Sequence, residues 1–463
     1  MPKRLLISTL ILGIGAIMVS KSHADPKVSS STLNRDLGYQ SSSTGDPVSR
    51  RGAQVSISAE QPKASDFGGM IFTTIAEPWT NRVVRVSAVV ESKGESAKPW
   101  IWLRADGSPG KSLKFATSAG RPLLANGHVS VDLRIPPDAE SIAFGVAMRG
   151  KGKTSARELR LDVSDYSLPG DEASAEQVYS EALRVVLENA YRPGNLPENL
   201  QELKPELSMQ PGTGYQAEKP VRALLLQLHD SHSIFRSAED AYLRSISGGD
   251  PRSVSVKLID GNVGYALMPG VGGSDGELGR RFAVEVDERL MRVNGDARCG
   301  WVVDLRRNTG GNMWAMISAL GMFFGEEHFG GFKSRDGSVE WWSLRYPSVT
   351  EVAGAALAHD AKVAVLLGPR TASAGEAVAV SFVGRENTMS FGAPTRGKAT
   401  ANKRFQLPDG SAIFLTTAVD VDRFGQEIDG AVVPDVLLSE DDVMSSDIPQ
   451  EALNWLRSSC SSR

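Results

Sequence analysis

The hydrophobic period of the chain changes near residue 165. From about Val55 to Asp165, apolar and polar residues alternate, as they do along the run Val129, Val131 and Leu133. Such alternation is typical of strands with one buried face, and Gly-containing turn pairs separate the runs. Residues 55–165 are therefore predicted to form an antiparallel, jelly-roll-like β-sandwich.

Beyond this segment the apolar residues first have helical spacing, and then segments with strand and helix spacing alternate. Ser174 and Gln177 have the spacing of a capping box, and residues 170–245 are predicted to be the helical part of a second region. Residues 250–440 alternate strand and helix, with buried strands expected at Gly300–Leu305 and Ala361–Leu367. This alternation predicts an α/β domain in which helices cover a sheet, followed by a C-terminal helix or tail over residues 441–463.

The N-terminal residues predict export. Residues 1–24 combine basic residues, an apolar run from Leu5 to Val19, and Ser22-His23-Ala24 before the expected cleavage point, which are the three parts of a signal peptide. The run is shorter than the roughly 20 residues of a membrane-spanning helix. We therefore expect a periplasmic or secreted protein with no stable membrane span after cleavage. The serine-rich residues 25–54 are interpreted as a flexible spacer.

Composition narrows the classes of partner. The 463 residues are 41% hydrophobic and 23% charged, with a formal net charge of −4 and well-mixed acidic and basic residues. This balance predicts a globular protein, and it argues against a nucleic-acid partner because no basic segment stands out. The oligomeric state stays open.

Two pairs of residues each allow two structural interpretations. Cys299 and Cys460 either form one disulfide that holds the C-terminal tail, or remain a buried thiol and a free thiol, and the second interpretation is slightly favoured. Trp100 and Trp102 either stack on a sugar or fill the sandwich core, and the core interpretation is favoured.

Two loops in the α/β region carry candidate chemistry. Ser373 lies between a buried strand and a helix, where free backbone N–H groups at the helix start face developing negative charge. Gly310 and Gly311 end another buried strand, and one of their amides is suited to half of an oxyanion hole. Taken singly, each loop is also typical of an ordinary helix cap or a glycine turn.

Several motifs in order resemble one peptidase family. They are Asp304-Leu305-Arg306-x-Asn308-x-Gly310-Gly311, Thr371-Ala372-Ser373-Ala374-Gly375-Glu376, Gly392-x-x-Thr395-x-Gly397, Leu407-x-Asp409-Gly410 and Pro434-Asp435. Together they resemble the tail-specific protease, or C-terminal processing peptidase, family of serine peptidases, with its tricorn-core and nisin-resistance branches. The resemblance implies a crotonase-like α/β peptidase core, with Ser373 as the nucleophile. It also implies an oxyanion hole formed by the amide of Ala374 and that of Gly310 or Gly311.

The resemblance leaves two candidates for the general base. Lys398 follows Ser373 by 25 residues, the spacing of the Ser/Lys dyad in processing peptidases. The other branches use a histidine from an Asp-x-His motif, which here is Asp230-Ser231-His232. His232 is favoured because only about 20 residues separate it from the strand expected near Val254, too few for the PDZ domain of processing peptidases. Neutral imidazole is also the easier base near neutral pH. Lys398 is the alternative base.

The group that orients the histidine is a further open choice. The resemblance implies Ser231 and a distal acid, for which Glu427 is the candidate, although the family position falls on Ile428, between Glu427 and Asp429. Asp230 is a third possibility. A metal site at His229, Asp230 and His232 is disfavoured because no second set of ligands with metal spacing accompanies it.

The sequence therefore predicts an exported serine peptidase that needs no metal or organic cofactor. A peptide or protein substrate, bound in extended conformation along a strand edge, is the expected partner, as the resemblance implies. The alternatives are a Ser/Lys-dyad processing peptidase and a non-catalytic peptide- or glycan-binding protein on the same scaffold. The natural substrate and the role of the sandwich stay open.

Overall fold

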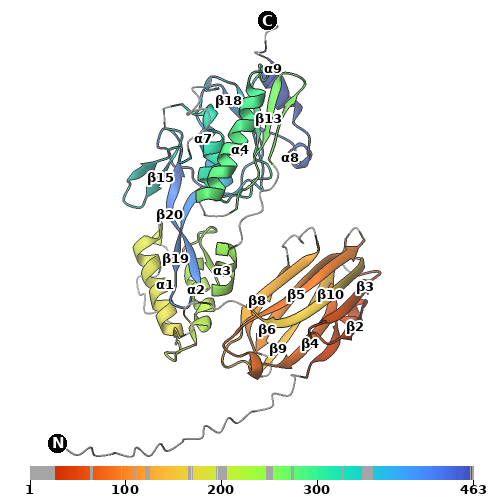
Figure 1. Ribbon diagram of the computed structural model, residues 1–463. Helices are drawn as coiled ribbons and strands as arrows, with labels where there is room; N and C mark the ends of the chain where they lie inside the picture. The colour runs from red at the N-terminus through yellow and green to blue at the C-terminus, as the bar shows by residue number, and fades with distance from the viewer. Residues whose placement is uncertain are drawn as a thin grey trace, which may run out of the picture. The chain divides into compact units, whose positions relative to one another are not determined.

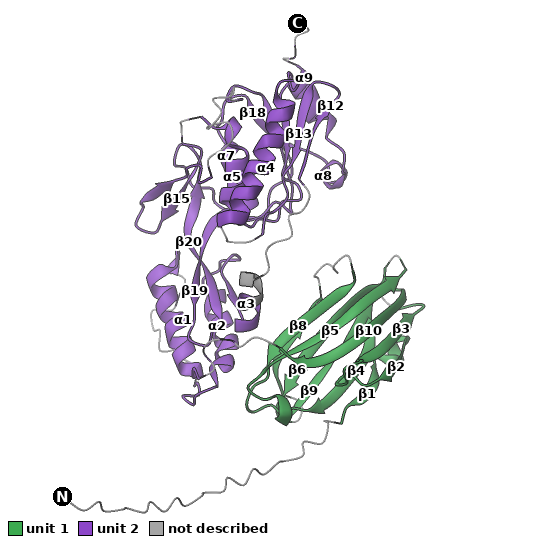
Figure 2. Cartoon of the chain, in the orientation of Figure 1, with its two compact units in different colours: residues 1–164 green, residues 165–463 purple. Residues whose placement is uncertain are grey.

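The chain divides into two compact units, residues 1–164 and residues 165–463 (Figure 2). The structure is a computed structural model. It describes residues 27–458 and 460, except 63–65, 95, 109–110, 120–125, 165–167, 169, 171, 194–195, 197–205, 247–253, 273–275, 326–327 and 347–357, and the side chains of residues 243–246. The predicted signal peptide lies outside these residues. No helix within the described ranges is long and apolar enough to cross a bilayer.

The first unit is a sandwich of two five-stranded antiparallel sheets (Figure 1). One sheet has the order β1 (Ser29–Leu33), β4 (Phe67–Ile75), β9 (Ser141–Arg149), β6 (Lys98–Asp106) and β7 (Ser112–Thr117). The other has the order β2 (Tyr39–Gly45), β3 (Ala53–Ala59), β10 (Gly152–Val163), β5 (Val83–Lys93) and β8 (His128–Arg134). Apolar residues at alternate positions face each other between the sheets, which confirms the predicted sandwich.

The sandwich begins earlier than its hydrophobic pattern predicts. Residues 25–54 were expected to be a flexible spacer, but they contain β1, β2 and the start of β3. The Tyr39 side chain is fully buried, and the Ser41 hydroxyl bonds the Thr32 hydroxyl and the Gly69 carbonyl, each at 3.0 Å. One buried aromatic and cross-strand hydroxyl bonds thus hold a serine-rich segment in strands that lack an apolar run.

The prediction that Trp100 and Trp102 fill the sandwich core is wrong. Ile101 and Leu103 of β6 face the core, so the tryptophans between and beside them face the outer side of the sheet. Trp102 is only 6% exposed there because it packs on small residues of β9 and next to Trp100.

The second unit contains a six-stranded sheet. Its order is β12 (Ser255–Ile259), β13 (Val263–Leu267), β14 (Trp301–Asp304), β17 (Val363–Leu367), β18 (Thr388–Gly392) and β21 (Val436–Leu437). All neighbours are parallel except β12 and β13, so the carboxyl ends of five strands meet at one edge. Ligand sites of open α/β sheets lie at this edge.

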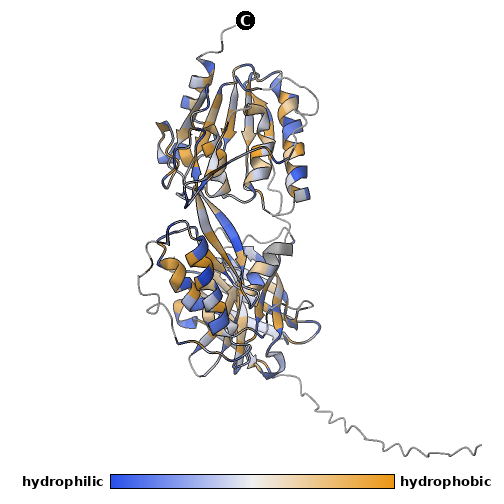
Figure 3. Cartoon of the chain, turned by 90° about the vertical axis from the view of Figure 1, so that its left-hand side faces the viewer, coloured by the Kyte–Doolittle hydropathy of each residue, from blue (hydrophilic) through white to orange (hydrophobic). Residues whose placement is uncertain are grey.

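Helices cover both faces of this sheet. α4 (Gly276–Asn294), α5 (Met313–Ala319) and α7 (Ala374–Phe382) pack on one face with the larger hydrophobic cluster of the unit. α9 (Gln450–Arg457) packs on the other face through Ala452 and Leu456. Figure 3 shows hydrophobic residues concentrated in the strands between these layers. The predicted α/β domain, in which helices cover a sheet, is therefore confirmed.

A disulfide holds α9 against the sheet. Cys460, just after the helix, is bonded to Cys299, just before β14, with 5.0 Å between the two Cα atoms. The favoured prediction of two free thiols is thus wrong. Sequence spacing did not show this pairing because 161 residues separate the two cysteines.

A helical part and a long hairpin complete the second unit. Its helices are α1 (Ala175–Asn189), α2 (Glu218–Leu226) and α3 (Ala238–Ile246), and Ser174 and Gln177 form the predicted capping box. β11 (Ile234–Arg236), β19 (Thr400–Gln406) and β15 (Gly331–Ser334) all pair with β20 (Ala412–Val421), and β16 (Val339–Trp341) adds to β15. The first half of β20 packs with α1 and α2. A short helix, α8 (Glu440–Met444), lies between β21 and α9.

Candidate active site

Ser373 lies at the turn between β17 and α7, as the sequence predicts. Its backbone has φ 53° and ψ −125°, which is a strained conformation for a residue other than glycine. Its N–H donates to the Glu376 carboxylate at 2.7 Å, and this bond helps to hold the strained turn. The Ser373 side chain is half-buried at the positive end of α7.

The glycine turn lies directly against Ser373. A Cβ placed on Gly310 would lie 3.0 Å from Ser373 Cβ and 3.2 Å from the Ala374 nitrogen. Gly310 and Gly311 have φ of +95° and +126°, so both need the conformational freedom of glycine. The structure thus brings together Ser373, Ala374 and the glycine pair, which the sequence places about 60 residues apart.

The two glycine amides are not equivalent. The Gly310 N–H donates to the Asn308 side-chain oxygen at 3.0 Å. The next residue, Gly311, fits closely against the 269–271 loop, because a Cβ there would lie 1.8 Å from the Val271 carbonyl oxygen. The Ala374 N–H belongs to the first turn of α7 and has no carbonyl partner within the helix.

Glu376 is a buried acceptor that the sequence analysis did not single out. Its carboxylate is fully buried and accepts from Ser373 N, the Thr395 hydroxyl, Gly397 N and Lys398 N at 2.6–2.9 Å. Burial raises the pKa of this carboxyl, and the four hydrogen bonds oppose that rise. The signal in the sequence was the capping-box spacing of Ser373 and Glu376. Glu376 thereby ties the serine turn to the loop that carries Lys398.

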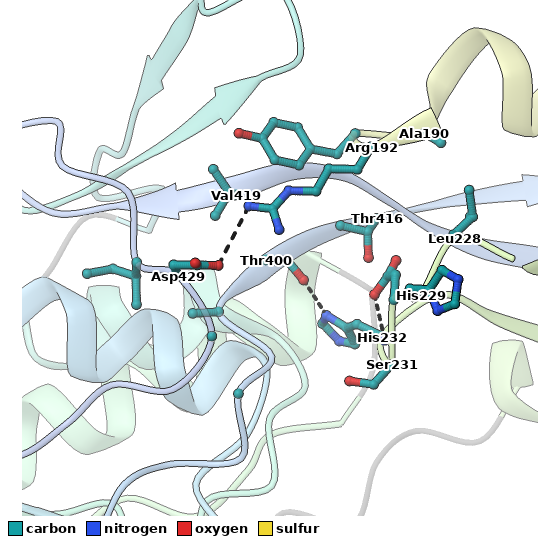
Figure 4. A pocket seen from close by; sticks show the side chains of 16 residues that line it. Ala190, Arg192, Leu228, His229, Ser231, His232, Thr400, Thr416, Val419 and Asp429 are labelled. Carbon is teal, nitrogen blue, oxygen red and sulfur yellow. Dashed lines mark hydrogen bonds and ion pairs between the residues drawn. The ribbon is translucent and has the colours of Figure 1, made fainter. Parts of the chain in front are cut away.

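His232 lines a separate cavity of about 390 Å³ beside that loop (Figure 4). Its Nδ1 lies 2.7 Å from the Thr400 hydroxyl oxygen, its backbone N–H donates to Asp230 at 2.7 Å, and its carbonyl accepts from the Asn402 side chain at 2.8 Å. The three contacts fix both the backbone and the ring of the histidine.

The environment of His232 keeps its imidazole neutral. Burial, together with the nearby positive charge of Lys398, lowers its pKa to about 4, while Asp230 opposes this shift. A neutral imidazole accepts a proton at neutral pH. The structure therefore brings the two candidate bases, His232 and Lys398, into one neighbourhood, although Ser373 is not among the residues that line the cavity.

The three groups predicted to orient His232 make different contacts. Ser231 lines the cavity with His232, and Asp230 holds the backbone of the loop through His232 N–H and the Ser233 hydroxyl. The Glu427 carboxylate forms an ion pair with Lys333 at 3.0 Å, and its role as the distal acid stays a prediction. Thr400 contacts the ring. No local sequence pattern points to Thr400, because the contact spans 168 residues.

Comparison with known proteins identifies the α/β region. Residues 262–438 match the sequence profile of peptidase family S41. This part of the chain is an S41 serine peptidase domain. The S41 domain includes Ser373, the glycine pair and Lys398, whereas His232 precedes it. Among the described residues, no group of three or more His, Cys, Asp or Glu side chains is arranged to hold a metal ion.

Named relatives agree with the S41 assignment. The nisin-resistance protein of Lactococcus lactis subsp. lactis is 24% identical over 234 residues, which cover 49% of this chain and 69% of that protein. A carboxyl-terminal-processing protease of Picosynechococcus sp. is 29% identical over 134 residues, 29% of this chain and 30% of that protein. A lipoprotein structure from Streptococcus agalactiae superposes with a TM-score of 0.51 at 22% identity, covering 64% of this chain and 99% of that chain. This structural likeness concerns the fold.

Proposed function

We propose that the protein is an exported serine peptidase that cleaves polypeptides with Ser373 as the nucleophile and His232 as the general base. The observation that carries the proposal is the strained Ser373 turn packed against Gly310. The neutral histidine held by Thr400 beside the neighbouring loop adds to it. Export rests on the signal-peptide pattern of residues 1–24.

The chemistry follows from these contacts. The Ser373 hydroxyl oxygen attacks the substrate carbonyl while His232 takes its proton, and the same imidazolium then protonates the leaving amine. The Ala374 N–H and a glycine N–H stabilise the oxyanion. We assign the second donor to Gly311, because the Gly310 N–H is already engaged by Asn308. Water then releases the acyl group by the reverse sequence of proton transfers.

The substrate is expected to bind in extended conformation. β19 pairs with β20 along one edge, and its first residue is Thr400, which contacts His232. A peptide that adds to the free edge of a strand is recognised mainly through main-chain hydrogen bonds. This mode of binding suits a polypeptide substrate of variable sequence.

A covalent probe tests the nucleophile. The chain from Asp25 onward should be labelled by a fluorophosphonate, and Ser373→Ala should abolish the labelling and reduce peptide hydrolysis by at least about a thousandfold. Ser381→Ala, a serine buried within α7, is the matched control and should keep labelling. Equal labelling of wild type and Ser373→Ala would refute the assignment, whereas a folded wild type without labelling would favour a non-catalytic binding protein.

A further inference from the structure

A second cavity lies at the carboxyl edge of the six-stranded sheet. It has a volume of about 380 Å³ and is lined by residues that follow β13, β14 and β17, together with the end of α8. Its residues are Leu267, Pro269, Arg306, Arg307, Pro369, Arg370, Val443, Met444 and Ser445. None of them lines the His232 cavity. Nothing in the peptidase chemistry above uses this space.

One of its three arginines has a structural role. Arg306 is 6% exposed and is paired with the buried Asp304 carboxylate at 2.7 Å. Its remaining N–H groups donate to the carbonyls of Asp442 and Ser445 at 3.2 and 3.0 Å, which fixes the end of α8 as a wall of the cavity. The Arg306 guanidinium therefore has little capacity left for a ligand.

The other two arginines have no such partner. Arg307 and Arg370 are exposed, and within the described ranges neither forms an ion pair with an acidic side chain. Asp304 and Asp447 act on Arg306, and no carboxylate is among the described lining residues. The first turn of α8 is acidic, but its carboxylates, those of Glu440, Asp441 and Asp442, do not line the cavity. Two guanidinium groups at the rim of one cavity give it a positive potential.

Apolar side chains contribute to the walls of the cavity beside the arginines. Leu267, Pro269 and Val443 line the inside, and Met444, which is 59% exposed, lies at the rim. Guanidinium groups bind carboxylates in a bidentate way, and an apolar wall next to them favours a ligand whose charge is attached to an apolar group. Inorganic phosphate could accept hydrogen bonds from the two guanidinium groups, but it has no apolar part to contact these walls.

We propose that this cavity binds a carboxylate that is attached to an apolar group, with Arg307 and Arg370 as its anion-binding residues. A small organic acid and the carboxyl end of a peptide share this chemistry. Arg307 lies three residues before Gly310, and Arg370 three residues before Ser373, so both loops of the proposed catalytic centre also reach the cavity. Binding there does not depend on the proposed hydrolysis, and the two ideas fail separately.

The test is a ligand-detected NMR titration of the chain from Asp25 onward at low ionic strength. The probes are N-acetyl-L-leucine, its neutral analogue N-acetyl-L-leucinamide, and inorganic phosphate. A hexapeptide ending in leucine, as free acid and as amide, is titrated into Ser373→Ala to prevent cleavage. We expect the acids to bind at least about tenfold more tightly than the amides, because a charge-assisted hydrogen bond to arginine is lost in the amide.

Variants locate the site. Arg307→Gln combined with Arg370→Gln should weaken binding of the acids at least tenfold. Arg157→Gln, the same substitution at one arginine of the sandwich, should leave binding unchanged. Binding of N-acetyl-L-leucine supports a small-acid ligand, and binding of the free-acid peptide alone supports a peptide end. Four outcomes would overturn the proposal. They are equal binding of acids and amides, binding of phosphate alone, no binding of any acid, and undiminished binding of the acids by the double variant. Near-ultraviolet circular dichroism checks that the variants are folded.

Discussion

Individual side chains connect the base to its surroundings across long stretches of sequence. The Thr400 hydroxyl contacts Nδ1 of His232, which leaves Nε2 as the ring nitrogen free to take a proton from the nucleophile. In this arrangement Thr400 takes the place that a carboxylate has in a Ser-His-Asp triad. A hydroxyl orients the ring without adding a charge, and this is consistent with the depressed pKa of His232.

The role of Thr400 is tested by removing only its hydroxyl. Thr400→Val keeps the shape of the side chain and should lower kcat about tenfold, the loss expected for one hydrogen bond of about 1.4 kcal/mol. Thr400→Ser should restore most of the rate, and KM should change little in both variants. Steady-state kinetics on a fluorogenic peptide measure the effect. Unchanged kcat in Thr400→Val would mean that another group orients the ring.

The charge of Lys398 separates the two candidate bases. The His232 pKa of about 4 predicts that kcat/KM falls only near pH 4 on acidification, because the imidazole stays neutral above that value. Lys398→Met removes a positive charge that lowers this pKa, so the acid limb should move to higher pH while activity at pH 8 persists. A pH profile of kcat/KM measures the shift. Loss of all activity in Lys398→Met, with near-normal activity in His232→Ala, would instead make Lys398 the base.

The sequence predicted the parts of the site that lie within short motifs. Ser373 and Gly310 stand out because a strand-to-turn pattern precedes each, and motif order then links them. Thr400 and Glu376 were missed as functional groups because their partners come from other elements, and no local pattern states which hydroxyl or amide will face them. The ion pair of Glu427 with Lys333 was missed for the same reason, since Lys333 is distant in sequence.

At the scale of elements, α9 depends on a covalent link as well as on packing. The helix has only two buried side chains, Ala452 and Leu456, and the Cys299–Cys460 disulfide holds its end to the start of β14. Periodicity predicts the strands and helices well because apolar residues repeat along them. It does not predict edge strands such as β1 and β2, whose serines satisfy their hydrogen bonds across strands rather than in an apolar core.

Reduction of the disulfide should destabilise the second unit. Closing a loop of 161 residues restricts the unfolded chain, so we expect dithiothreitol to lower the free energy of unfolding by about 2–4 kcal/mol. Urea unfolding followed by tryptophan fluorescence measures the change. Cys460→Ser should have the lower stability from the start and should not respond to dithiothreitol. An equal response of both proteins would show that reductant acts elsewhere.

At the scale of the whole molecule, the sandwich and the peptidase unit have separate hydrophobic cores. The sandwich has ten strands in two sheets and buries its own aromatic residues, such as Tyr39 and Phe144. The hydrophobic period already predicted a boundary near residue 165, because each unit carries a different hydrophobic repeat. The predicted start of the first unit was too late in the sequence, because residues 25–54 already contain strands.

The sandwich should fold without the peptidase unit. Residues 25–164, expressed alone, should give a cooperative thermal transition and a β-rich circular dichroism spectrum, because the unit keeps its whole core. Gly145→Ala should lower the melting temperature of this fragment markedly, since a Cβ there would lie 2.0 Å from the Met70 carbonyl oxygen. Ser58→Ala, on β3, is the matched control. A fragment without a cooperative transition would show that the sandwich needs the rest of the chain.

The two halves of strand β20 contact the parts of the chain that carry the proposed nucleophile and the proposed base. Its first half packs with α1 and α2 and pairs with β11, just after His232, whereas its second half pairs with β15. Ser373 lies in the turn that follows β17 of the six-stranded sheet, inside the matched S41 range, and His232 lies before that range. A protein engineer could therefore exchange residues 170–245 together with their side of the hairpin to deliver a different base, while the nucleophile and its oxyanion donors stay as they are.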